Sequence, residues 1–177
     1  MLLTFKLLKK YRNLNKFTIE FNNGLNVIVG ENGSGKSSFL NLIMDHNKEI
    51  VEITTKDNAK YRFFDSEKNN PRLNNAVSTN LEMFNLHSHF ISHGEAMLPI
   101  IKAMSDFKNE TIIIDEPESG LSLSNQKIVI DLLNDSIKNN CQIIISTHSY
   151  VIIKNTKHVF SMNKLKWISS KEFLKKI

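Results

Sequence analysis

The sequence predicts an α/β protein with a mixed central sheet. Three short apolar runs, Leu25–Val29, Thr111–Ile114 and Gln142–Ser146, have the composition of buried parallel strands. Segments with helical spacing of apolar residues follow them, and this alternation is typical of a sheet covered by helices. At 177 residues the chain is long enough for one domain, residues 1–177, with one sizeable core.

The N-terminal part of the chain predicts an antiparallel β region. Leu2–Leu8 and Phe17–Phe21 are predicted strands, and turn residues follow the second of them. A helix is predicted after Ser37, to about residue 47, from its apolar spacing. Ile50–Thr54 and Ala59–Phe64 then have the pattern of a hairpin around residues 56–58.

The remaining segments are assigned in the same way. The polar composition of residues 65–75 predicts a loop. The apolar spacing over residues 81–107 predicts a helix that is interrupted near residues 92–94. The chain from about 76 to 108 is therefore predicted to form one short helical segment. Leu123–Ile137 predicts a helix with an apolar face; this face comprises Ile128, Leu132 and Ile137. A short helix at 151–154 and one or two edge strands, over Val159–Met162 and Lys164–Ile168, complete the prediction.

Composition restricts the class of protein. The longest apolar runs are far shorter than the roughly 18 residues of a membrane span, and residues 1–6 lack the pattern of a secretory signal. The single cysteine, Cys141, excludes an internal disulfide and has the setting of a small buried residue. We therefore expect a cytoplasmic protein without membrane insertion. The net charge of +5 permits contact with nucleic acid without requiring it.

A glycine-rich run directly follows the first predicted buried strand. Gly30-Glu31-Asn32-Gly33-Ser34-Gly35-Lys36-Ser37 fits G-x-x-x-x-G-K-[ST], the loop whose backbone N–H groups surround nucleotide phosphates. The glycines let the backbone approach the phosphates, and the helix that follows favours negative charge at its N-terminus. Lys36 is expected to contact the β- and γ-phosphates, and Ser37 to ligate Mg²⁺. The alternative is an ordinary Gly/Ser-rich turn.

Two adjacent carboxylates end the second predicted buried strand. Asp115 is expected to complete the Mg²⁺ site, directly or through water, and Glu116 to orient the attacking water as general base. An isolated Asp-Glu pair would be better explained as a solvated acidic turn. Together with the phosphate loop, the pair predicts a protein that binds and hydrolyses ATP.

The order of these motifs resembles the ATP-binding cassette (ABC) superfamily of ATPases, particularly its RecF/SMC-like branch, the stand-alone ABC-like ATPases. Tyr11-Arg12-Asn13 is similar to an element placed near the nucleotide, and Ser119-Gly120-Leu121-Ser122 to a dimer-contact loop. Ser146-Thr147-His148-Ser149 resembles the segment whose histidine senses the γ-phosphate. The resemblance implies catalytic roles for Lys36, Glu116 and His148. It also implies an ATP-binding set, which comprises Arg12, Asn32, Gly33, Ser34, Gly35, Lys36, Ser37 and Ser38.

The chain departs from the superfamily at two loops. Ile91-Ser92-His93-Gly94-Glu95 stands at the signature loop, so Ser92 and Gly94 would bind the ATP of the other subunit; Ser92 and Glu95 also fit a helix capping box. The loop after the early strands lacks its usual Gln, and Asp65 or Glu67 would replace it. A separate hypothesis is a Zn²⁺ site; its ligands would be His87, His89 and His93.

The resemblance implies a head-to-tail dimer that forms on ATP and opens after hydrolysis. In that branch such dimers act in DNA repair or processing, or in defence against foreign DNA, with a protein partner. Two alternatives stay open: a subunit that energises a membrane transporter, and a non-hydrolysing ATP sensor. Tyr11 is the candidate for stacking on the purine.

Overall fold

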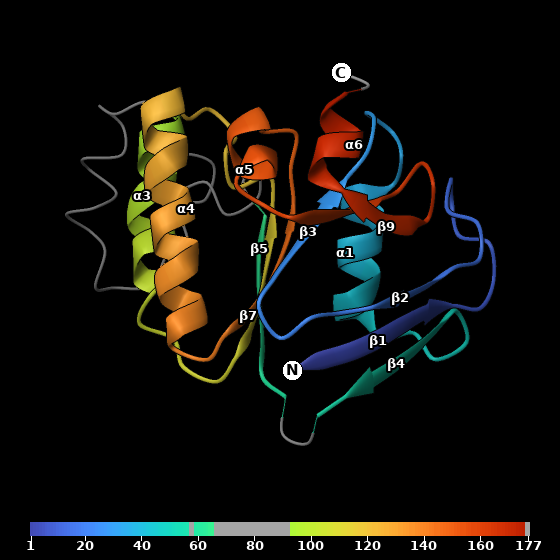
Figure 1. Ribbon diagram of the computed structural model, residues 1–177. Coiled ribbons are helices and arrows are strands. Elements are labelled where there is room, and N and C mark those ends of the chain that lie inside the picture. The colour runs from blue at the N-terminus through green and yellow to red at the C-terminus, as the bar shows by residue number, and fades with distance from the viewer. Residues whose placement is uncertain (57–58, 66–92, 176–177) are drawn as a thin grey trace.

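The computed structural model describes residues 1–56, 59–65 and 93–175 (Figure 1). A six-stranded sheet forms its centre, with the strand order β5-β6-β7-β3-β8-β9. Its strands are β5 (Tyr61–Asp65), β6 (Thr111–Asp115), β7 (Gln142–Ser146), β3 (Leu25–Val29), β8 (His158–Ser161) and β9 (Lys166–Ser169). The first five are parallel, and β9 pairs antiparallel with β8. The predicted mixed sheet is thereby confirmed.

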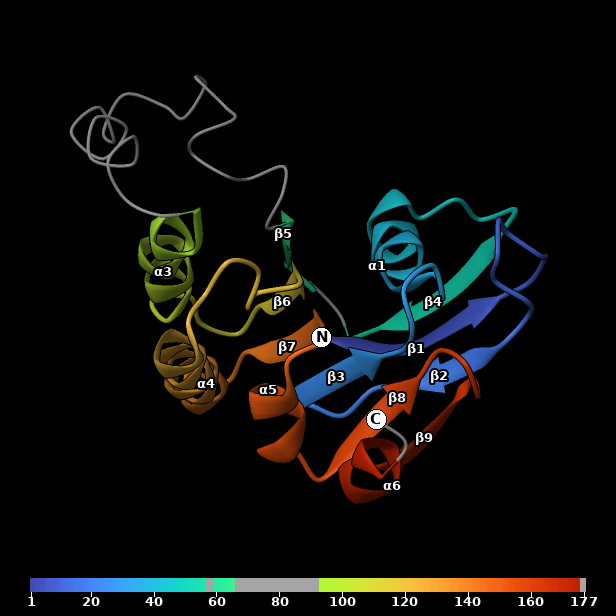
Figure 2. The ribbon, with the colours of Figure 1, turned by 90° about the horizontal axis from the view of Figure 1, so that it is seen from above.

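A second, three-stranded antiparallel sheet has the order β2-β1-β4. Its strands are β1 (Leu2–Leu7), β2 (Thr18–Glu20) and β4 (Val51–Thr55). Helix α1 (Lys36–Asp45) lies between this sheet and the central sheet, as the view from above shows (Figure 2). The predicted N-terminal antiparallel region is present.

The other face of the central sheet is covered by helices α3 (His93–Met104), α4 (Leu123–Lys138) and α5 (Tyr150–Lys154), whereas α6 (Ser170–Leu174) contacts β8 and β9 (Figure 2). Alternate strand residues face the two layers, because side chains along a strand point to opposite faces. Ile113 and Ile144 pack with α1 and the small sheet, while Ile112 and Ile143 pack with the helices opposite. Central strands buried on both faces explain the continuous isoleucine runs. Within the described residues, no helix combines the length and the apolar character needed to span a bilayer.

One predicted pairing is wrong. Ile50–Thr54 and Ala59–Phe64 correspond to β4 and β5, but these strands do not form a hairpin. β4 pairs with β1 in the small sheet, and β5 pairs in parallel with β6 at the edge of the central sheet. The apolar surface available on each sheet, rather than the short connection, decides the pairing.

Three smaller predictions also need correction. Ile128 is 46% exposed, and the fully buried face of α4 contains Val129 and Leu133 instead. Of the one or two edge strands predicted near the C-terminus, β9 lies at the edge of the sheet, and β8 is an interior strand because it pairs with β3 as well as β9. Helix α6 was not predicted. The loop predicted at 65–75, apart from Asp65, and the helix predicted over 81–92 lie outside the described residues.

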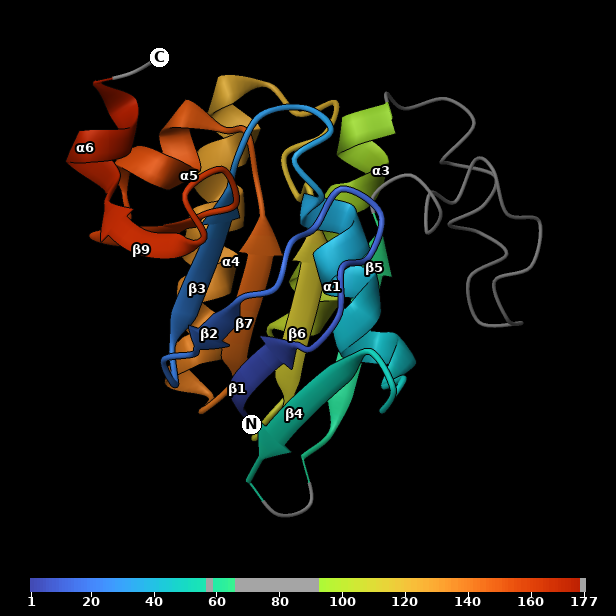
Figure 3. The ribbon, with the colours of Figure 1, turned by 90° about the vertical axis from the view of Figure 1, so that its right-hand side faces the viewer.

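The parallel strands β3, β6 and β7 all end at one edge of the central sheet (Figure 3). We call this the site edge. Three segments begin there, at residues 30–35, 116–122 and 147–149, and each of them contains residues of a motif found in the sequence. Parallel pairing therefore brings together groups that lie far apart along the chain.

Candidate functional site

The glycine-rich loop connects β3 to α1 in a strained conformation that glycine accommodates. Gly35 has φ 93° and caps the N-terminus of α1. A Cβ atom at Gly35 would lie 2.3 Å from Leu14 Cδ2. Leu14 belongs to the segment between β1 and β2, and this segment lies too close to Gly35 to leave space for a side chain there. Gly33 has φ 77°, with open space around the position of a Cβ.

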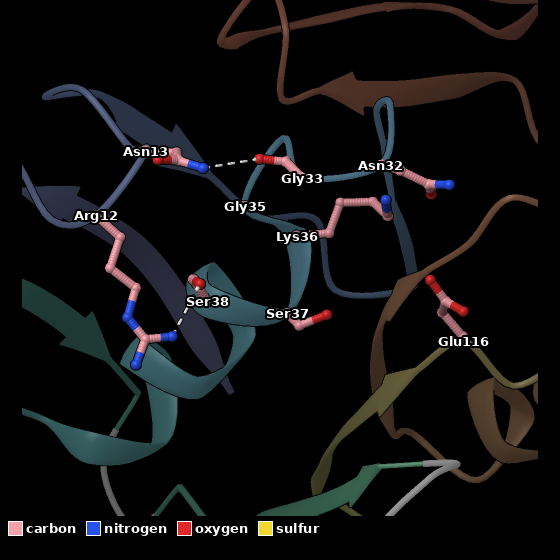
Figure 4. Close-up of a pocket in the computed structure, with 9 residues that line it drawn as sticks. All are labelled: Arg12, Asn13, Asn32, Gly33, Gly35, Lys36, Ser37, Ser38 and Glu116. Carbon is pink, nitrogen blue, oxygen red and sulfur yellow. Dashed lines mark hydrogen bonds between the residues drawn. The ribbon is translucent and has the colours of Figure 1, made fainter.

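A cavity of about 370 Å³ lies over this loop (Figure 4). Its lining residues are Arg12, Asn13, Asn32, Gly33, Gly35, Lys36, Ser37, Ser38 and Glu116. The carboxylate of Glu116 faces the side of the cavity that Lys36 and Ser37 form (Figure 4). The fold thus gathers eight predicted site residues around one space. Ser34, Asp115 and His148 lie close to it without lining it.

Lys36 is buried at the floor of the cavity, with 5% of its surface exposed. Its ammonium donates hydrogen bonds to the carbonyl oxygens of Gly30 (3.2 Å) and Glu31 (3.3 Å). Burial lowers the pKa of Lys36, and the charges of Glu116 and Asp115 oppose that shift. The amine is therefore a buried cation beside carboxylates, in a position to meet an anion that enters the cavity.

Asp115 ends β6 and is 7% exposed. It lies opposite Ser146 of β7, whose hydroxyl donates a hydrogen bond to its carboxylate. On its other side it lies opposite Asp65, the last residue of β5. Of the two candidates to replace the missing Gln, Asp65 is thus beside Asp115 in the sheet register, and Glu67 lies outside the described residues.

Glu116 has a left-handed backbone conformation, with φ 51°, which is uncommon for a residue with a Cβ. Its N–H contacts both the carbonyl and the hydroxyl oxygen of Ser146, each at 3.2 Å. Burial, followed by the charge of Glu118, raises the pKa of the Glu116 carboxyl. The imidazole of His148 opposes this shift, with its Nε2 3.5 Å from Glu116 Oε1. A raised carboxyl pKa suits a group that must accept a proton.

Glu118 was not predicted as a site residue, but its carboxylate organises the segment that carries His148. Glu118 Oε1 accepts hydrogen bonds from Thr147 Oγ1 (2.7 Å), His148 N (2.6 Å) and Ser149 N (3.0 Å). Its other oxygen is buried without a hydrogen-bond partner among the described residues. Its partners lie about thirty residues further along the chain, so no local pattern indicates the contact.

Gln126 of α4 makes a second link across the site edge. Its amide nitrogen donates to Leu121 O (3.1 Å), and its amide oxygen accepts from Ser149 Oγ (2.7 Å). Leu121 belongs to the loop that resembles a dimer-contact loop. Gln126 and Glu118 together join that loop to the His148 segment.

The N-terminal element predicted near the nucleotide does lie beside the phosphate loop. Asn13 Nδ2 donates to Gly33 O (3.3 Å), and Arg12 Nη1 lies 3.5 Å from Ser38 Oγ. A second cavity, of about 510 Å³, shares Arg12 and Ser38 with the first and is also lined by Tyr11. The second cavity extends the space of the first. Together they have room for a ligand that continues beyond its phosphate groups.

The site's donor chemistry fits a magnesium–nucleotide complex. Ser37 and Asp115 supply a hydroxyl and a carboxylate, the hard oxygen ligands that Mg²⁺ takes together with phosphate oxygens. Among the described residues no cluster of three His, Cys, Asp or Glu side chains is arranged to hold a metal alone.

Several predicted residues fall outside this description. Ser92, His87 and His89 lie outside the described residues, so the signature-loop and Zn²⁺ hypotheses stay predictions. Gly94 lies in the first turn of α3, the helix that the signature-loop hypothesis requires.

Comparison with known proteins agrees with this geometry. A family model described as "AAA domain, putative AbiEii toxin, Type IV TA system" matches residues 88–154, which include the acidic pair and the His148 segment. Curated protein sequences gave no match.

Among solved structures, the chain is similar to "An inward-facing conformation of a putative metal-chelate type ABC transporter", with a TM-score of 0.67 and 20% identity over 96% of this chain and 84% of that one. It is also similar to cbiO1 from Clostridium perfringens, part of the ABC transporter complex cbiONQ (TM-score 0.63, 16% identity, 97% and 90% covered). UvrA2 from Deinococcus radiodurans matches with a TM-score of 0.65 and 11% identity over 90% of this chain, which spans 35% of UvrA2. The chain therefore has the fold of an ATP-binding cassette ATPase domain, and the resemblance found in its motifs is confirmed at that level.

The close approach at Gly35 leads to a stability prediction. Gly35→Ala should lower the free energy of unfolding by about 2–4 kcal/mol, because left-handed strain adds to overpacking against Leu14. Gly33→Ala, with equal strain but open space, should cost about 1–2 kcal/mol. Urea denaturation measures both. In a Leu14→Ala background the cost of Gly35→Ala should fall to that of Gly33→Ala, and an unchanged cost would contradict the proposed contact.

Proposed function

We propose that the protein is a Mg²⁺-dependent ATPase. The observation that carries this proposal is the convergence of Lys36, Ser37 and Glu116 on one cavity, with Asp115 beside it. Asn32, Gly33, Ser34 and Gly35 would surround the phosphates with the backbone, and Ser38 and Arg12 would lie along the ligand toward the second cavity. Tyr11, which lines that cavity, is placed to contact the base.

In the proposed reaction each side chain has its own role. Lys36 neutralises charge on the β- and γ-phosphates. Ser37 and Asp115 would hold the cation, which would supply further charge neutralisation. Glu116 orients a water molecule for attack on the γ-phosphate and accepts its proton. His148, whose Nε2 lies 3.5 Å from Glu116 Oε1, would sense the γ-phosphate, as the resemblance implies.

The proposed active form is a head-to-tail dimer in which Ser92 and Gly94 of one subunit bind the ATP held by the other. Leu123, directly after the loop at 119–122, is 68% exposed, which supports an apolar contact at this place in the fold. Hydrolysis would remove the γ-phosphate shared by both subunits and so open the dimer.

The proposed setting is a cytoplasmic DNA-directed process, either repair or processing or a defence system, with a partner protein. The description of the matching family model, which names a toxin of a type IV TA system, supports a defence setting. Coupling to a membrane transporter is the second candidate, supported by the transporter cassettes that share the fold.

Glu116→Gln should hydrolyse ATP at least about 100-fold more slowly while still binding it, because only the proton acceptor is lost. Phosphate release measures turnover, and gel filtration with ATP and Mg²⁺ should show the variant as a dimer. Lys36→Ala, which removes the phosphate contact, serves as the blank. Phosphate release by the unmodified protein no higher than this blank would instead support the ATP sensor.

The raised pKa of Glu116 determines the pH dependence. Because the base works only when ionised, turnover should rise with pH through a midpoint above the value of about 4.3 for an ordinary glutamate. His148→Gln removes a group that lowers this pKa, so the midpoint should move to higher pH. His46→Gln, remote from the site, should leave it unchanged. A midpoint that moves to lower pH in His148→Gln would exclude this coupling.

Glu118→Ala should reduce turnover by tenfold or more while changing ATP affinity by less than about threefold. The reason is that His148 and its neighbours lose three hydrogen bonds, whereas the phosphate loop keeps its contacts. Glu118→Gln retains an acceptor oxygen and should recover part of the turnover. Glu52→Ala, at an exposed carboxylate paired with Lys6, is the control. Equal losses of affinity and turnover in Glu118→Ala would contradict a positioning role.

A further inference from the structure

An open groove of about 860 Å³ lies between α5 and α6, which stand side by side near the site edge (Figures 1 and 3). We call it the α5–α6 groove. Its lining includes Tyr150, Lys154, Lys157, Ser170, Lys171 and Lys175. Four of them are exposed lysines, and none of the described residues that line it is acidic.

Hydrogen bonds fix the two walls of the groove relative to each other. Ser170, at the start of α6, is 5% exposed and donates its N–H to Lys157 O at 3.1 Å. Its hydroxyl also donates to Thr156 O and Lys157 O, in the turn after α5. The lysines on both walls therefore keep a defined spacing.

The lysine charges are not compensated within the described chain. Lys154, Lys157, Lys171 and Lys175 make no ion pair with any described carboxylate, and the acidic residue of α6, Glu172, pairs with Lys164 instead. The whole chain has 18 acidic residues and 23 Lys and Arg, so acidic and basic residues are nearly equal in number. A groove lined by four lysines and no described carboxylate is therefore much more positive than the chain as a whole. Such a concentration of positive charge attracts a polyanion.

An aromatic side chain stands among these charges. Tyr150 is 57% exposed, and Lys154 Nζ lies 5.7 Å from the centre of its ring. An exposed aromatic ring beside lysines is the combination that binds single-stranded nucleic acid, because each unpaired base can stack on the ring while the backbone follows the charges. A duplex keeps its bases stacked internally, and a membrane surface is too flat to fill a groove.

We propose that the α5–α6 groove binds single-stranded nucleic acid. The four lysines contact successive phosphates, and one base stacks on Tyr150. Binding itself does not require ATP hydrolysis.

The groove is also joined to the ATP site. Ser149 caps α5 by accepting a hydrogen bond from Ile152 N (3.1 Å), and its own N–H donates to Glu118. Tyr150 and Lys154 thus lie on a helix that begins at the segment of His148. Binding of single-stranded nucleic acid in the groove therefore alters the rate of ATP hydrolysis, a consequence that rests on the proposed ATPase function.

Fluorescence anisotropy with a labelled twelve-nucleotide oligo(dT), without nucleotide, tests the binding. Affinity should fall with salt, with a slope of log K against log salt of about −3 for four phosphate contacts. Lys171→Ala/Lys175→Ala should reduce that slope by about 1.4 and weaken binding about tenfold or more at low salt. Tyr150→Ala should weaken binding at least about fivefold without changing the slope.

A matched control removes two exposed lysines elsewhere, Lys48 and Lys60. Lys48→Ala/Lys60→Ala has the same charge loss and should bind almost as the unmodified protein does. All changed side chains are exposed, and circular dichroism verifies folding. Equal weakening in both double variants would overturn the proposal, as would stronger binding to the matching duplex, to poly-glutamate or to vesicles of phosphatidylcholine and phosphatidylserine.

Phosphate release with and without the oligonucleotide separates this proposal from the proposed function. Oligonucleotide binding by a protein that releases no phosphate would reject the ATPase and support the groove. Hydrolysis by a protein that does not bind the oligonucleotide would reject the groove alone.

Discussion

The hydrogen bonding of one largely buried carboxylate, that of Glu118, determines the geometry of the site edge. β6 and β7 are parallel neighbours, but the chain segments after them are joined only by contacts beyond the strand ladder. Glu118 accepts three hydrogen bonds from residues 147–149, and its second oxygen is buried without a described partner. A buried carboxylate is stable only where donors compensate it. The segment of His148 therefore has little freedom to adopt another conformation.

The pKa values of Lys36 and Glu116 are shifted from their ordinary values in opposite directions, and burial is the main cause of both shifts. Burial disfavours both charges, so the pKa of the amine falls and that of the carboxyl rises. Phosphate oxygens near both groups would stabilise the ammonium and disfavour the carboxylate, whereas a cation at Asp115 has the reverse effect. On Glu116 the two effects oppose each other, so a cation in the proposed site would offset the effect of the phosphates on this carboxylate.

Features that depend on neighbouring residues could be predicted from the sequence, and features that depend on distant ones could not. The strands and the phosphate loop have local patterns, so their positions agree with prediction. The hairpin of β4 and β5 was wrong because each strand joins a different sheet. Ile128 was assigned to the buried face of α4 because apolar spacing alone does not fix the rotation of a helix, and it is 46% exposed. Glu118 was missed because its partners come from another strand end.

The fold does not identify the target of the proposed ATP site. The same fold occurs in structures described as transporters and in UvrA2, at 11–20% identity, so we infer that surfaces outside the proposed site specify the partner. The α5–α6 groove is such a surface, and Ser149 connects it to Glu118 and Gln126. A ligand that shifts α5 must strain these hydrogen bonds, and a change at His148 must displace the same helix. Because coupling between two binding sites is reciprocal, occupancy of the groove and occupancy of the ATP site then alter each other by the same factor.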